Sequence, residues 1–149
     1  MTDLRRKAEV ALKTLLDKGF QAYFSGGCVR DMVMGVEPLD YDIATDATPK
    51  AVMSLFPRSL SVGAKFGVVV VLDDKDQFQV ATFRSDQGYT DGRHPDQVVY
   101  TDAREDVRRR DFTINGMLYQ PFTDELIDLV GGKSDIEAKT IRTIGDPAI

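Results

Sequence analysis

The fold of the chain is decided by residues 22–45, which read AYFSGGCVRDMVMGVEPLDYDIAT. The apolar run at the start of this stretch ends at Gly26-Gly27 and predicts a strand that enters a turn. Residues 29–34 predict a short helix, and residues 41–44 predict a second strand. The order of strand, glycine turn, helix and strand predicts a mixed α/β arrangement built around the turn.

Two aspartates, Asp40 and Asp42, accompany the second predicted strand. Because strand side chains alternate between faces, both carboxylates are expected to project from the same side. Two carboxylates so placed can share divalent ions, and their oxygens suit Mg²⁺. The pair therefore predicts a metal-binding and catalytic site.

The Gly26-Gly27 turn is a candidate phosphate site. Backbone without side chains can approach a phosphate closely there, and the start of a helix favours an anion. Arg30 follows one turn later and can add a charge-assisted contact. A lone Gly-Gly is usually a turn, and a lone Asp-x-Asp is usually a solvated strand end. At this spacing, the glycine turn and the aspartate pair together favour nucleotidyl transfer.

The rest of the chain predicts further elements. Residues 3–17 predict an amphipathic helix capped by Thr2 or Asp3, and Thr48-Pro49 starts another helix. In order, the remaining pattern predicts a hairpin over 66–84, a long polar loop over 85–97, a helix over 102–118 with a break near Asp111, a small hairpin over 119–130, and a last helix opened by the capping box Ser134 to Glu137.

Composition narrows the class of protein. The 149 residues include 19 basic and 24 acidic side chains, a net charge of −5, and suit a single domain. The one cysteine, Cys28, rules out an internal disulfide, favours a cytoplasmic location and leaves too few soft ligands for a zinc site. The N-terminus does not resemble a signal peptide, and no stretch approaches the roughly 20 apolar residues of a membrane span. The acidity predicts weak, salt-sensitive RNA binding.

The motifs resemble a known family. The segments 26–31 and 40–45 are similar to the head of class II tRNA nucleotidyltransferases, which are the CCA-adding enzymes and the related bacterial poly(A) polymerases of the polymerase-β-like superfamily. The resemblance continues over residues 80–84, 89–96 and 105–115, and at residues 127–128 and 131–132. It implies an α/β (α+β) head with a mixed or antiparallel sheet of about five strands flanked by helices, spanning residues 1–149. The neck, body and tail of the family are expected to have no counterpart in this chain.

The resemblance implies roles for individual residues. Asp40 and Asp42 would be catalytic and hold two Mg²⁺ ions, with ATP and CTP as substrates and the tRNA 3′ end as partner. The implied nucleotide-binding residues are Gly26, Gly27, Arg30, Arg84, Arg109, Arg110, Asp111 and Asn115, and the implied flexible loop includes Asp91, Arg93, His94 and Pro95. Asp111 and Asn115 lie four residues apart, so we expect them to share a helix face and meet sugar hydroxyls. For the loop residues, an exposed loop without a ligand is an equal alternative.

Three features of the sequence bear on which function this head has. Only Lys65 is basic in residues 61–70, where poly(A) polymerases tend to cluster arginines, so CCA addition is favoured over a poly(A) polymerase-type head. Gln79 stands where the family usually has a third carboxylate, which keeps open a degenerate nucleotide- or RNA-binding module with little activity. A nucleotidyltransferase acting on a small molecule is disfavoured by the segment 109–113.

Overall fold

The computed structural model describes residues 2–63, 67–89, 95–100, 103–108, 112–142 and 144. Its helices are α1 (Asp3–Asp17), α2 (Gly27–Val33), α3 (Pro49–Leu55), α4 (Ala103–Arg108), the 3₁₀ helix η2 (Thr113–Asn115) and α5 (Gly132–Glu137). Its strands are β1 (Ala22–Ser25), β2 (Asp42–Thr45), β3 (Ser59–Gly63), β4 (Val68–Asp73), β5 (Asp76–Thr82), β6 (Arg84–Tyr89), β7 (Pro95–Tyr100), β8 (Met117–Gln120) and β9 (Glu125–Asp128).

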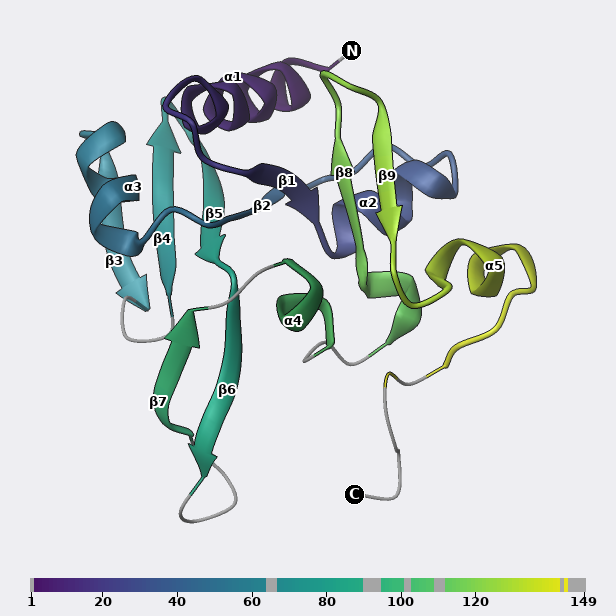
Figure 1. Cartoon of the computed structure of the whole chain (residues 1–149). Coiled ribbons are helices and arrows are strands. Elements are labelled where there is room, and N and C mark those ends of the chain that lie inside the picture. Colours follow the sequence, from purple (N-terminus) through teal and green to yellow (C-terminus); the bar gives the residue numbers. More distant parts are fainter. Residues whose placement is uncertain are drawn as a thin grey trace.

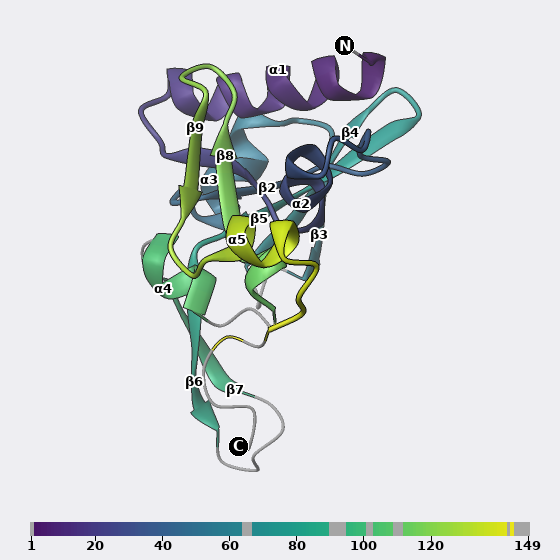
Figure 2. The same ribbon diagram turned by 90° about the vertical axis from the view of Figure 1, so that its right-hand side faces the viewer.

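Seven strands form one mixed sheet in the order β3-β4-β5-β2-β1-β8-β9. Strands β2 and β5 pair in parallel, whereas their neighbours in this sheet pair antiparallel. Strands β6 and β7 form a separate ribbon that projects from the sheet on the side opposite α1 (Figures 1 and 2). The expected α/β class with a mixed sheet is confirmed. The sheet is larger than the expected five strands, in part because β3 carries no clear strand pattern.

One face of the sheet is covered by α1, α2 and α3. Phe24, Ile43 and Val80 are in register across β1, β2 and β5 and are fully buried on this face. The helices contribute small and branched side chains to the same core: Ala8, Ala11, Leu12 and Leu15 from α1, Cys28 and Val29 from α2, and Val52 from α3. Because strand side chains alternate, the residues next to the core row, including Asp42, project from the opposite face.

The opposite face is covered only in part by α4 within the described residues. Val107 of α4 is buried against Ala44, Phe83 and Leu118, and Tyr23 borders this second cluster. Figure 1 places α4 beside the point where the β6–β7 ribbon leaves the sheet. This face of the sheet is therefore apolar where α4 packs on it and polar at Asp42.

The helix starts follow the capping signals for α1 and α3. The Thr2 hydroxyl accepts the Arg5 backbone N–H at 3.2 Å, and the Thr48 hydroxyl accepts that of Ala51 at 3.3 Å. The capping-box prediction for the last helix is wrong, because α5 begins two residues before Ser134. Its cap is the Asp128 carboxylate at the end of β9, which accepts the N–H groups of Gly132 (2.7 Å) and Lys133 (3.0 Å).

Two other predictions need correction. Much of the predicted loop 85–97 is the ribbon of β6 and β7, in which Tyr89 pairs with Pro95. The sequence of these two strands does not alternate between apolar and polar residues, and that alternation is the pattern by which a half-buried strand is recognised. Among the described residues of the predicted helix over 102–118, only α4 is α-helical, whereas Asn115 belongs to the 3₁₀ turn η2 and residues 117–118 begin β8. The expectation that Asn115 shares a helix face with Asp111 stays a prediction, because Asp111 lies outside the described residues.

Candidate nucleotide-binding site

The site is built on one row of residues across the centre of the sheet. Asp42 of β2 is in register with Ser25 of β1 on one side and with Gln79 of β5 on the other. In-register neighbours project to the same face, so these three side chains stand next to one another. Asp42 and Gln79 are exposed, whereas Ser25 is buried. The row presents a carboxylate and an amide to solvent on the face away from α1, α2 and α3.

Asp40 stands two residues before Asp42 and is also exposed, while Tyr41 between them is 1% exposed. The Tyr41 ring packs on Phe24 with centroids 5.2 Å apart, so it anchors the entrance to β2 in the core. Burial raises the pKa of Tyr41 to about 12, which keeps the phenol neutral. Asp40 and Asp42 are thus both exposed on either side of the buried Tyr41, but Asp40 precedes β2, so the expected projection of both carboxylates from one side stays a prediction.

The Gly26-Gly27 turn connects β1 to α2 beside this row. Gly26 has φ +72° and ψ −137°, a conformation that favours glycine because it lacks a Cβ. The Cys28 thiol donates to the Ser25 carbonyl at 3.2 Å and lies 3.9 Å from the Asp42 carbonyl. Burial raises the pKa of the Cys28 thiol to about 11. Cys28 therefore joins the turn to β2 as a buried packing residue, not as a nucleophile.

Arg30 folds back from α2 over the glycine turn. A Cβ added at Gly27 would stand 3.3 Å from Arg30 Nη2, so the missing side chain leaves room for the guanidinium. Arg30 Nη1 donates to Asn115 Oδ1 at 3.1 Å. Its Nε and Nη2 donate to Asp31 Oδ1 at 3.3 and 3.2 Å. The structure thus brings together two predicted site residues that are 85 positions apart in the chain.

The other predicted residues are placed as follows. Arg84 is the first residue of β6. Pro95 is the first residue of β7 and pairs with Tyr89, the last residue of β6. Arg109, Arg110, Asp111, Asp91, Arg93 and His94 lie outside the described residues. Of the predicted nucleotide-binding set, the structure brings together Gly27, Arg30 and Asn115 at the turn that follows Ser25, the neighbour of Asp42 in the sheet.

The donor set around Asp42 fits a magnesium ion. Mg²⁺ prefers oxygen ligands, keeps several waters, and is commonly held by one or two carboxylates together with substrate phosphates. Asp40 and Asp42 supply two exposed carboxylates, and the Gln79 amide supplies a neutral oxygen next to them. Within the part of the chain that the structure describes, no three His, Cys, Asp or Glu residues gather in a metal-binding group. The site thus offers two carboxylates, not three.

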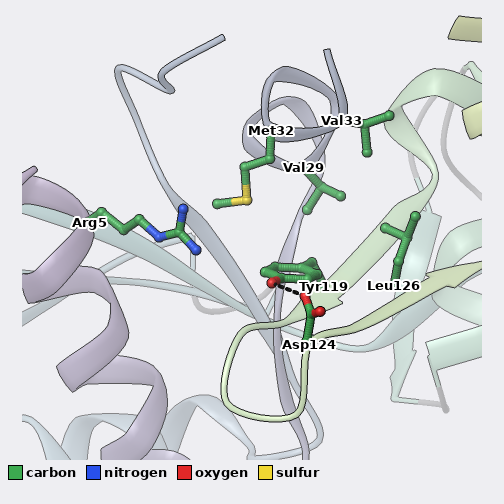
Figure 3. A pocket seen from close by; sticks show the side chains of 7 residues that line it. All are labelled: Arg5, Val29, Met32, Val33, Tyr119, Asp124 and Leu126. Atoms are coloured by element: carbon green, nitrogen blue, oxygen red, sulfur yellow. Dashed lines mark hydrogen bonds between the residues drawn. The ribbon is translucent and has the colours of Figure 1, made fainter. Parts of the chain in front are cut away.

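A pocket that the sequence did not suggest lies on the other side of α2. It has a volume of about 350 Å³ and is lined by Arg5, Val29, Met32, Val33, Tyr119, Asp124 and Leu126 (Figure 3). The Tyr119 hydroxyl donates to Asp124 Oδ1 at 2.6 Å within it. Helix α2 thus separates a mainly apolar pocket from the polar site at Arg30. Val29, Met32 and Val33 are spaced as residues on one face of a helix, and this spacing is equally typical of core packing. The sequence therefore gave no indication of a pocket here.

The fold is that of a head domain of the poly(A) polymerase type. The family model for the poly A polymerase head domain matches residues 22–142, and the chain belongs to this family. No helix among the described residues is long and apolar enough to cross a membrane.

Proteins similar to this chain include CCA-adding enzymes. The Bacillus pumilus enzyme is 51% identical over 92% of this chain and 34% of its own length. The Bacillus subtilis enzyme is 44% identical over 95% of this chain and 36% of its own length. The crystal structure of the Bacillus stearothermophilus CCA-adding enzyme in complex with CTP matches with a TM-score of 0.85 and 36% identity, over 97% of this chain and 34% of that one. The chain spans about a third of the length of these relatives.

Proposed function

We propose that residues 1–149 form the catalytic head of a CCA-adding tRNA nucleotidyltransferase. In this reaction the 3′-hydroxyl of tRNA attacks the α-phosphate of CTP or ATP, and pyrophosphate leaves. The observation that carries the proposal is the placement of Asp42 between Ser25 and Gln79, beside the glycine turn and Arg30. The likeness to the Bacillus stearothermophilus enzyme, whose structure contains CTP, supports CTP as a substrate.

Asp40 and Asp42 would hold the magnesium ions. When bound, these ions neutralise the triphosphate and stabilise the entering and leaving oxygens. Tyr41 and the core row hold the backbone of the two aspartates in place, so ions held by these carboxylates would have a fixed position relative to the sheet. Arg30 and the backbone of Gly26-Gly27 are placed to bind and orient the triphosphate. Arg84, Arg109, Arg110 and Asp111 are proposed to complete the nucleotide pocket, and Asp91, Arg93, His94 and Pro95 the flexible loop.

The tRNA contacts of this chain are proposed to be weak. The net charge of −5 opposes a polyanion, and binding to phosphates requires lysines and arginines. The two thirds of the relatives' length without counterpart in these 149 residues would provide most of the RNA contacts and the choice between C and A. A cytoplasmic location is part of the proposal, and the proposed tRNA partner supports it.

A second candidate is a nucleotide-binding module with little activity. Gln79 favours it, because an amide beside Asp42 brings no negative charge to a metal that three carboxylates would hold more tightly. This candidate predicts binding of CTP without incorporation. A poly(A) polymerase-type head instead predicts that only A residues are added, in a run.

The test combines binding and incorporation. The purified chain is titrated with CTP in the presence of Mg²⁺, and it is separately incubated with α-labelled CTP or ATP and tRNA that ends before CCA. We expect label at the tRNA 3′ end and its loss, by about a hundredfold or more, in Asp42→Ala. Asp17→Ala is the matched control, because Asp17 is an exposed aspartate on α1 paired with Lys13.

The outcomes separate the candidates. Binding of CTP without incorporation supports the nucleotide-binding module, and a run of A residues alone supports the poly(A) polymerase-type head. Incorporation that survives Asp42→Ala would overturn the metal assignment. Absence of both binding and incorporation would overturn the proposal as a whole.

A further inference from the structure

The guanidinium of Arg30 is held from two sides by side chains of different elements. Asp31 of α2 accepts Nε and Nη2 through Oδ1, and Asn115 of η2 accepts Nη1 through its own Oδ1. A guanidinium carries five N–H donors, and these contacts engage three of them. One N–H on each Nη is not used by these two residues and is left to donate to a phosphate.

Asn115 uses its amide oxygen for this contact, which bears on its role. The oxygen that accepts Arg30 Nη1 at 3.1 Å has one of its two lone pairs engaged by the arginine, which leaves one lone pair for any further donor. Arg30 is half-buried, with 35% of its side chain exposed, so the contact lies at the edge of the site. A long arginine side chain loses much rotamer freedom when it binds a ligand. A contact that restricts it beforehand lowers that cost.

The turn that carries Asn115 is itself firmly anchored. The Thr113 hydroxyl donates to Asp135 of α5, and the Thr113 N–H donates to the Arg142 carbonyl at 3.0 Å. Gly132 packs so tightly against the turn that an added Cβ would stand 2.3 Å from the Thr113 carbonyl oxygen. Asn115 is therefore presented from a fixed position relative to α5 and not from a pliable loop.

We propose that Asn115 is a positioning residue that pre-orients Arg30 for the triphosphate, and not a residue that reads the ribose. This inference rests on the proposed function, because it requires that Arg30 binds nucleotide phosphate. The contact between Asn115 and Arg30 links the position of η2, and of α5 packed against η2, to the arginine that is proposed to bind the triphosphate. The ligand part that Asn115 serves is thus the β,γ-phosphate portion of the substrate.

The test compares two nucleotides that differ in this portion. CTP and CMP are titrated into the chain with Mg²⁺ by calorimetry, for the wild type, Asn115→Ala, Arg30→Ala and the double variant. We expect Asn115→Ala to weaken CTP binding about tenfold, the size of a lost hydrogen bond to a charged group, and to leave CMP binding unchanged. In the Arg30→Ala background, Asn115→Ala should have no further effect, because the contact it removes is already absent.

Two further variants separate positioning from folding. Asn115→Asp keeps an oxygen that accepts from Arg30 and should restore CTP affinity at least in part. Gln21→Ala removes an exposed amide at the other end of β1 and should change neither nucleotide's affinity. The melting temperature of each variant shows whether the fold is retained.

Two results would overturn the inference while leaving the proposed function intact. One is an equal loss of CTP and CMP affinity in Asn115→Ala, which would assign Asn115 to the sugar. The other is a full effect of Asn115→Ala in the Arg30→Ala background. If the wild type binds no CTP, or if Arg30→Ala binds CTP normally, the proposed role of Arg30 fails and the inference fails with it.

Discussion

Asp42 of β2 and Gln79 of β5 are direct neighbours in the parallel strand pair at the centre of the sheet. The resemblance to class II nucleotidyltransferases places a glutamate at the position of Gln79. The register shows that this position adjoins the proposed catalytic aspartate, although the two residues are 37 positions apart in the chain. The departure from the family pattern therefore falls on the proposed metal site itself.

Restoring the carboxylate should strengthen this site. We expect Gln79→Glu to lower the Mg²⁺ concentration needed for CTP binding and to raise turnover by about tenfold at limiting Mg²⁺, because a third negative ligand attracts the ion. The measurement is nucleotide binding and incorporation across a Mg²⁺ titration. Gln77→Glu adds the same charge two residues earlier on β5 and is the matched control. Unchanged or lower turnover in Gln79→Glu would show that Gln79 does not limit the site.

Cys28 should be unreactive in the folded chain. Burial raises its pKa to about 11, so at pH 8 only a small fraction of the thiol is ionised, and its sulfur lies inside the core. We expect reaction with a disulfide reagent such as DTNB to be slower by at least about a hundredfold than in the chain unfolded in urea. Fast modification of the native chain would mean that the glycine turn opens readily.

Gly132 should tolerate no side chain. An added Cβ would stand 2.3 Å from the Thr113 carbonyl oxygen and 3.1 Å from Met117 Cγ, so Gly132→Ala must displace η2 or α5. We expect a loss of about 3 kcal/mol in the free energy of unfolding, measured by urea denaturation.

The neighbouring glycine provides the matched control for this prediction. Gly131 has φ +80° but no atom within 4 Å of an added Cβ. Gly131→Ala should therefore cost only the strain of a left-handed alanine, about 1 kcal/mol. If both variants lose the same stability, the close packing of Gly132 on η2 is not what makes that position sensitive.

Asp135 should contribute to acid sensitivity. The hydrogen bond from Thr113, aided by Arg142, lowers the pKa of Asp135 below its usual value of 3.8. A carboxyl whose pKa is lower in the folded state than in the unfolded state adds stability above its unfolded pKa. That stability is lost as the pH falls through the folded value.

The test of this linkage is a comparison of stability with pH. Thr113→Val removes the hydroxyl, so the difference in stability between wild type and variant should be present at pH 6 and should shrink below about pH 4. The free energy of unfolding is measured by urea denaturation across this range. A difference that stays constant down to pH 2 would show that the contact with Thr113 is not linked to the ionisation of Asp135.

The sequence alone determined the class of the fold and the central motif. The glycine turn, the alternation around Tyr41, and the threonine caps of α1 and α3 are local signals. Each depends on backbone conformation, strand alternation or hydrogen bonds within a few residues. The order of motifs also indicated the family, which the match to residues 22–142 confirmed.

Only the tertiary structure decided which distant residues meet. Asp42 adjoins Gln79, Arg30 contacts Asn115, and Asp128 replaces Ser134 as the cap of α5, all because of sheet register and packing between separated segments. The ribbon of β6 and β7 escaped prediction for the same reason, since its strands pair with each other and lack an apolar alternation. Local patterns encode what a segment does by itself. Contacts between segments depend on how the whole chain buries its apolar faces.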